Sequence, residues 1–211
     1  MKNNKKLLIA ILVILAIIIL PLGGNILYRF IKIDMAQNAP YLYINGKTVS
    51  KVEYDYYYYS YYNSYIAEYS SLFSYMNVNA DEDLLKQQYD DNRTFEQYFN
   101  DCAVDQIIKI QALNDDGLAN GFEYDVDADY DEFLSIIKET CDSANVSLNT
   151  YFKQFYGEYA SEKKIKPLLK YGFYATAYYT YLCDTMNKDE NDLTAFYYTG
   201  KLKDKYEIKY P

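Results

Sequence analysis

Residues 43–65 read YINGKTVSKVEYDYYYYSYYNSY, and this stretch decides the fold. Its first residues continue a strand over 41–44, and Asn45-Gly46 is a strong signal for a two-residue hairpin turn. Residues 47–49 can return as a second short strand. The start of the stretch therefore predicts a small hairpin.

A long helix is predicted to follow the hairpin, over about 51–76. Ser50 and Glu53 have the spacing of a capping box, in which the two side chains satisfy backbone amides at a helix start. The residues that follow are dominated by tyrosine, and helical geometry sorts their side chains into faces.

Helical geometry arranges side chains of residues 52–73 in three groups. A first stripe consists of Val52, Tyr59, Tyr62, Ile66, Tyr69 and Phe73. A second, adjoining stripe consists of Tyr54, Tyr57, Tyr58, Tyr61, Tyr65 and Leu72. The opposite, polar side carries Glu53, Ser60, Ser64, Glu68 and Ser71. One neighbouring helix needs only a narrower apolar stripe, so either two elements pack here or part of the aromatic surface stays open.

Two interpretations of this helix follow. In the first, it is a core helix whose tyrosine hydroxyls reach water. In the second, the second stripe is the wall of a groove for unfolded polypeptide, since tyrosine joins a large apolar ring to a hydroxyl that can bond a passing backbone. The six residues of the second stripe are therefore the peptide-binding candidates, and both interpretations can hold for different stripes.

The rest of the chain predicts further helices and one more strand. Helices are expected near 82–91, 94–114, 130–143, 148–156, 162–187 and 190–200, with stop signals at Gly117, Gly121, Gly157 and Gly200. Pro167 either kinks the helix over 162–187 or marks its true start. Residues 205–210 alternate like a strand that could pair with the first hairpin. The expected fold class is mainly α, with a small β element formed by the N-terminal hairpin and the C-terminal strand.

Upstream of the hairpin lies a predicted membrane anchor over 1–33. Three lysines precede the aliphatic run LLIAILVILAIIILPL at 7–22. The run lacks the small residues of a cleavage site and a lipoprotein cysteine, so an uncleaved signal anchor is favoured over a signal peptide. Positive charge ahead of the run favours a cytoplasmic N-terminus. We therefore expect a single-pass cell-membrane protein with a linker over 34–40 and one extracytoplasmic domain over 41–211.

Charge and composition exclude several classes of function. All 30 acidic residues lie after position 33 but only 16 of the 21 basic ones do, which leaves a net charge of −14 there and argues against nucleic-acid binding. The absence of histidine excludes histidine-dependent catalysis. No phosphate-binding loop, nucleophile elbow or metalloprotease motif occurs, so we expect no catalytic residue, metal site or cofactor.

Three cysteines, Cys102, Cys141 and Cys183, are widely spaced. They fit neither a metal motif nor a disulfide framework. The favoured interpretation is that the three cysteines are small apolar residues on helix faces. The alternative is one disulfide between two of them.

The acidic run 125–132 has alternating carboxylates like a calcium loop. Tyr130 stands where that loop requires glycine, and Ile136 stands where it requires a bidentate glutamate. A solvated loop with a helix cap at Asp129 and Glu132 is therefore expected, with weak divalent-cation binding as the alternative.

The order of features resembles the N-terminal chaperone-like region of SurA- and PrsA-type peptidyl-prolyl isomerases, in particular the tyrosine-rich versions of clostridial bacteria. The similar stretches are residues 43–65, 151–181 (YFKQFYGEYASEKKIKPLLKYGFYATAYYTY) and 192–208 (DLTAFYYTGKLKDKYEI). The resemblance implies a helical unit with a small strand element that holds unfolded secreted proteins. A parvulin domain normally accompanies that region, and no isomerase active site can be carried over onto this chain.

The sequence therefore predicts a membrane-anchored, non-catalytic, chaperone-like protein that binds unfolded or newly exported polypeptides. One alternative is a truncated peptidyl-prolyl isomerase whose parvulin domain is missing. Another is an envelope adaptor that binds one dedicated partner. The sequence does not determine the oligomeric state.

Overall fold

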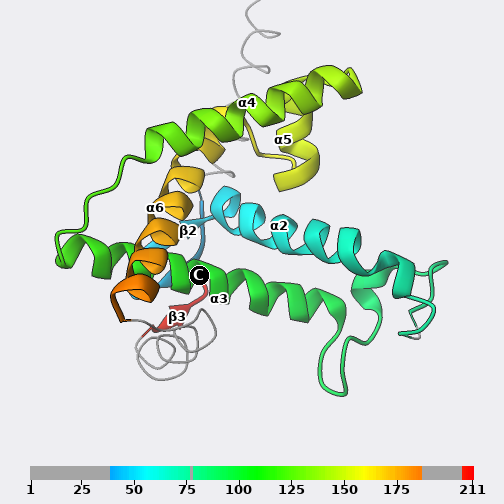
Figure 1. Cartoon of the computed structure of the whole chain (residues 1–211). Helices are drawn as coiled ribbons and strands as arrows, with labels where there is room; N and C mark the ends of the chain where they lie inside the picture. Colours follow the sequence, from blue (N-terminus) through cyan, green and yellow to red (C-terminus); the bar gives the residue numbers. More distant parts are fainter. Residues whose placement is uncertain (1–38, 77, 187–205) are drawn as a thin grey trace, which may run out of the picture. The chain divides into compact units, whose positions relative to one another are not determined.

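A computed structural model of the chain describes residues 39–76, 78–186 and 206–211 (Figure 1). All of these residues except Ala39 belong to a compact unit that spans Pro40–Pro211. The elements in chain order are β1 (Pro40–Ile44), β2 (Lys47–Ser50), α2 (Lys51–Tyr69), the 3₁₀ turns η1 (Ser70–Leu72) and η2 (Leu84–Lys86), α3 (Phe95–Ala119), α4 (Val126–Ala144), α5 (Leu148–Tyr156), α6 (Glu162–Met186) and β3 (Ile208–Lys209). The unit is mainly helical with a three-stranded sheet, as expected.

The sheet has the strand order β2-β1-β3, with both pairs antiparallel. Asn45 and Gly46 take positive φ values of 50° and 76°, which the two-residue turn between β1 and β2 requires. Ile208 pairs with Ile44, so the C-terminal strand joins the first hairpin as predicted. Leu42 and Ile44 are completely buried because the sheet packs against the helices on one face.

The capping side chains place the starts of α2 and α3. The Ser50 hydroxyl accepts a hydrogen bond from the Glu53 amide at 3.2 Å, as predicted for α2. Thr94 and Gln97 form a complete capping box at the start of α3. These local signals explain why both helix starts agree with the expectation.

The region between α2 and α3 differs from the prediction. The first helix ends at Tyr69 rather than 76, and the helix expected over 82–91 is a loop with one 3₁₀ turn. Short polar side chains compete with helical hydrogen bonds here, since Asp83 accepts from the Leu85 amide and Asp90 from the Arg93 amide.

One further boundary, the start of α4, was predicted wrongly. The helix expected to start at 130 starts at Val126. Asp125 caps it, because its side chain accepts a hydrogen bond from the Asp127 amide at 3.0 Å. The acidic run 125–132 is thus mostly helical rather than a loop, and Asp129 and Glu132 do not cap the helix.

α5 and the Gly157 stop agree with the prediction, and Gly157 has a φ of 98°. Helix α6 begins at Glu162 and continues through Pro167, so the proline does not mark its start. Cys102, Cys141 and Cys183 lie on α3, α4 and α6, with only Cys141 buried.

Some predictions fall on residues that the structure does not describe. They are the anchor over 1–33, nearly all of the linker over 34–40, and the helix over 190–200. Within 39–76, 78–186 and 206–211, no helix has the length and apolar character needed to cross a membrane.

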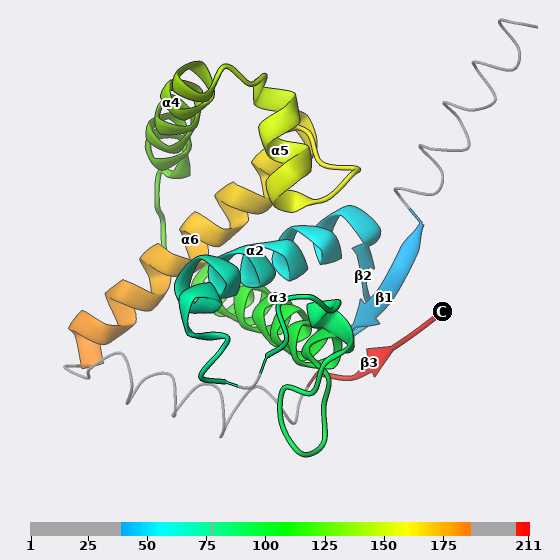
Figure 2. The ribbon, with the colours of Figure 1, turned by 90° about the vertical axis from the view of Figure 1, so that its right-hand side faces the viewer.

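The buried side chains form two clusters, which use different halves of α6. Figure 2 shows α4 and α5 above α6, and α2 and α3 below it. The larger cluster joins the sheet, α2, α3 and the C-terminal half of α6. The smaller one joins α4, α5, the N-terminal half of α6 and Val52. α2 therefore packs against neighbours on more than one side, which accounts for its two tyrosine stripes.

Gly117 was expected to stop α3 but lies buried inside it. A Cβ atom here would lie 2.9 Å from Cε1 of Tyr174 and 3.1 Å from Cγ of Tyr178, so the glycine lets α3 and α6 approach closely. Gly117→Val is expected to lower the free energy of unfolding by about 1–3 kcal/mol, because the added side chain overpacks this contact.

Urea unfolding followed by tyrosine fluorescence measures this effect. The exposed neighbour Ala119→Val is the control, expected to change the free energy by only about 0.6 kcal/mol through helix propensity. Equal losses in the two variants would contradict the close approach of α3 and α6.

Candidate functional site

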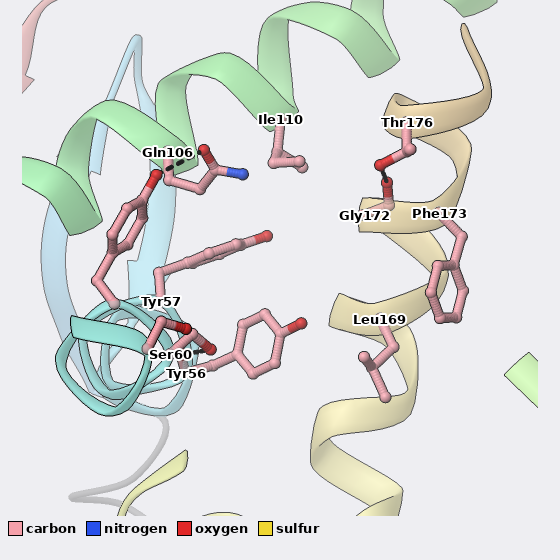
Figure 3. Close-up of a pocket in the computed structure, with 11 residues that line it drawn as sticks. Tyr56, Tyr57, Ser60, Gln106, Ile110, Leu169, Gly172, Phe173 and Thr176 are labelled. Atoms are coloured by element: carbon pink, nitrogen blue, oxygen red, sulfur yellow. Dashed lines mark hydrogen bonds between the residues drawn. The ribbon is translucent and has the colours of Figure 1, made fainter. Parts of the chain in front are cut away.

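An open groove of about 340 Å³ lies between α2, α3 and α6 (Figure 3). It sits where the two buried clusters meet, since Tyr57 and Ile110 belong to the larger cluster and Leu169 to the smaller. Its lining consists of Tyr56, Tyr57, Ser60, Tyr61, Ser64, Gln106, Ile110, Leu169, Gly172, Phe173 and Thr176. This volume is near the lower end of the range found for pockets that bind small molecules or peptide side chains.

Helical spacing brings these residues together. On α2 the lining positions repeat at intervals of three to four residues from Tyr57 to Ser64, and on α3 Gln106 and Ile110 are four apart. In Figure 3 the rings of Tyr56 and Tyr57 extend from α2 towards α6, with their hydroxyls in the space between the helices.

Several hydroxyl groups in the groove already donate to protein acceptors. The Tyr61 hydroxyl donates to Gln106 Oε1 at 3.2 Å. Ser60 donates to the main-chain oxygen of Tyr56 at 2.6 Å, and Thr176 to that of Gly172 at 3.0 Å. The oxygens of Ser60 and Thr176 can therefore still accept, but their hydrogens are committed.

Tyr56 and Tyr57 differ from these groups. Among the described residues, neither hydroxyl has a hydrogen-bond partner, although Tyr57 is only 5% exposed. Burial raises the pKa of Tyr56 to about 12 and raises the pKa of Tyr57 as well. Both hydroxyls therefore keep their protons near neutral pH and can donate to a ligand.

The groove contains no charged side chain among its eleven lining residues. Two larger hollows, of about 450 and 720 Å³, differ in this respect because Arg93 and Asp101 line one and Glu82 and Lys86 the other. An uncharged, mainly apolar lining suits uncharged ligands, because a charge would lose its hydration there without gaining a partner.

Gly172 keeps the groove open from the side of α6. A Cβ atom at this position would meet no heavy atom within 4 Å, so helix packing does not require a glycine. Glycine inside a helix costs about 0.5–1 kcal/mol relative to alanine. Its effect here is to leave room beside Tyr56 and Tyr57.

The six peptide-binding candidates are not brought together on one open face. Tyr57 and Tyr61 line the groove. Tyr54 is buried at the sheet and donates to Asn100 Oδ1, and Tyr58 is buried against Phe99.

The remaining two candidates lie towards the far end of α2. Tyr65 packs within a cluster of aromatic rings, and its buried hydroxyl has no hydrogen-bond partner among the described residues. Leu72 lies beyond α2 in η1 and is 45% exposed. Of the six candidates, only Tyr57 and Tyr61 therefore line this groove, and the peptide-binding role of the six residues stays a prediction.

Most of the groove was missed by reasoning from the sequence. Ser60 and Ser64 were assigned to the polar, solvent side, yet they line the groove beside Tyr56. The residues from α3 and α6 carry no local signal, with the exception of Gly172, a glycine inside a long amphipathic helix.

Comparison of the chain with protein-family models, with curated proteins and with solved structures gave no match. The resemblance to SurA- and PrsA-type proteins thus stays a prediction. Within the part of the chain that the structure describes, no group of three or more cysteine, aspartate or glutamate side chains could hold a metal ion.

Proposed function

We propose that this protein binds uncharged segments of unfolded polypeptides in the groove between α2, α3 and α6. The observation that carries the proposal is the open, neutral groove that Gly172 leaves beside two tyrosine hydroxyls without a hydrogen-bond partner among the described residues. Aromatic rings provide contact area that tolerates many sequences, and hydroxyl and amide groups can bond a backbone. These properties suit a chaperone-like protein.

We further propose that the N-terminal apolar run anchors this domain on the extracytoplasmic side of the cell membrane. Tethering would raise the local concentration of a weak binder near newly exported polypeptides. The net charge of −14 after position 33 would keep a complex with an apolar client soluble.

Gly172→Leu is expected to abolish the suppression of aggregation of a chemically denatured model enzyme. The added side chain enters the groove, whereas the fold should keep or gain stability because leucine is a better helix former than glycine. Light scattering in the presence of the full chain, held in lipid nanodiscs, measures the suppression, and empty nanodiscs give the background.

Thr185→Leu is the matched control, since it adds leucine to an exposed position of α6 outside the groove. This variant should suppress aggregation like the wild type. Full suppression by a folded Gly172→Leu variant would rule out the groove as the binding site. Capture of one stoichiometric partner without any suppression would instead favour a dedicated adaptor.

A further inference from the structure

The hydrogen-bonding groups of the groove indicate which part of a bound polypeptide they recognise, and this step rests on the proposed function. Tyr57 is the decisive residue because it packs in the larger buried cluster while its hydroxyl has no hydrogen-bond partner among the described residues. Figure 3 shows this hydroxyl directed into the groove. The hydroxyl opens onto the groove, so an acceptor of a bound ligand can take the place of the water that this hydroxyl would otherwise bond.

Gln106 provides a second donor. Its Oε1 atom accepts from Tyr61, so its amide nitrogen keeps both hydrogens for other acceptors. In Figure 3 this nitrogen lies on the side of Gln106 that faces the groove, near Ile110. No hydrogen bond within the described residues uses it.

The available hydrogens therefore come from Tyr56, Tyr57, Gln106 and the exposed Ser64. Those of Ser60, Tyr61 and Thr176 are committed to protein oxygens. Such a set of donors needs a ligand with acceptors. Main-chain carbonyl oxygens of an extended segment are uncharged acceptors at regular spacing. A carboxylate is also an acceptor, but its transfer into an uncharged groove of an acidic domain is unfavourable.

We propose that Tyr57 and Gln106 donate hydrogen bonds to main-chain carbonyls of the bound segment, so that the groove recognises an uncharged, extended backbone and rejects acidic side chains. Tyr57 is then a specificity-determining residue for the client. Its ring contributes to the core, and its hydroxyl serves the ligand.

The test compares the wild-type chain with Tyr57→Phe, both in nanodiscs, by fluorescence anisotropy. The probe is a labelled ten-residue peptide of alternating leucine and serine, and a second probe has aspartate in place of the two central serines. Tyr57→Phe should raise the Kd of the neutral probe about fivefold, the loss expected for one hydrogen bond. Its thermal midpoint should stay equal or rise, because the removed hydroxyl bonds no other group of the part of the chain that the structure describes. The wild type should bind the aspartate probe at least tenfold more weakly than the neutral one.

The outcomes separate this inference from the proposed function. If Tyr57→Phe and the wild type bind the neutral probe equally while Gly172→Leu does not bind, the groove binds polypeptide but backbone recognition by Tyr57 is overturned. If Tyr57→Phe loses thermal stability, the hydroxyl has a structural role and the inference also fails. If the wild type does not bind, or Gly172→Leu binds as well as the wild type, the proposed site itself is wrong.

Discussion

Phe99→Ala is expected to lower the free energy of unfolding by about 3–5 kcal/mol, the cost of removing a fully buried aromatic ring. Phe99 on α3 is 0% exposed and packs against rings from α2, with centroid distances of 5.4 Å to Tyr62, 5.4 Å to Tyr65 and 6.1 Å to Tyr58. Its removal would leave a cavity at the centre of the contact between α2 and α3.

Urea unfolding followed by tyrosine fluorescence is a suitable measurement, because the chain has 29 tyrosines and no tryptophan. Tyr75→Ala is the control, since this ring is 85% exposed, and its loss should change the free energy by at most about 0.5 kcal/mol. If Phe99→Ala lowered the free energy of unfolding by less than about 1 kcal/mol, the packing of α2 against α3 would not depend on this ring.

Glu53→Gln is expected to stabilise the protein at pH 8 by up to about 3 kcal/mol and to leave stability at pH 4 unchanged. Burial raises the pKa of Glu53 from 4.5 to about 7, and a hydrogen bond from the Ser50 backbone offsets part of this rise. The folded state thus favours the protonated form. Glutamine remains neutral and can still accept the backbone hydrogen bond of the capping box.

The pH dependence has a definite sign. Between pH 4.5 and 7 the folded protein holds a proton on Glu53 that the unfolded chain has lost, so the stability of the wild type falls as the pH rises through this window. Urea unfolding at pH 4, 6 and 8 should show this fall in the wild type and less of it in Glu53→Gln. The exposed residue Glu139 supplies the control variant Glu139→Gln, and an equal response of both variants would contradict the assignment to Glu53.

The parts of the fold that followed from the sequence have local causes. The hairpin turn at Asn45-Gly46, the cap at Ser50 and the stop at Gly157 each depend on the conformational preferences of a few adjacent residues. The helix that was wrongly expected over 82–91 shows the limit of such patterns. Its apolar spacing was helical, but aspartate side chains bonded to the backbone and made turns.

The candidate site depended on contacts between distant segments. Helical periodicity separated Tyr57 from Ser60 into an apolar and a polar side, and both line the groove because α6 passes over the boundary between these sides. Gly117 likewise looked like a stop signal, but it serves as a contact point for Tyr174.

The sequence by itself determined the mainly helical fold class, the hairpin, and the starts of α2 and α3, because short-range hydrogen bonds and side-chain periodicity specify them. Alternation predicted the C-terminal strand, but its pairing with β1 joins Ile44 to the distant Ile208 and forms only in the tertiary structure. Only the tertiary structure decided which tyrosines are core and which line the groove. That choice depends on where α3 and α6 cover α2, and side chains up to about 120 positions apart in the chain, such as Tyr56 and Thr176, meet only after folding.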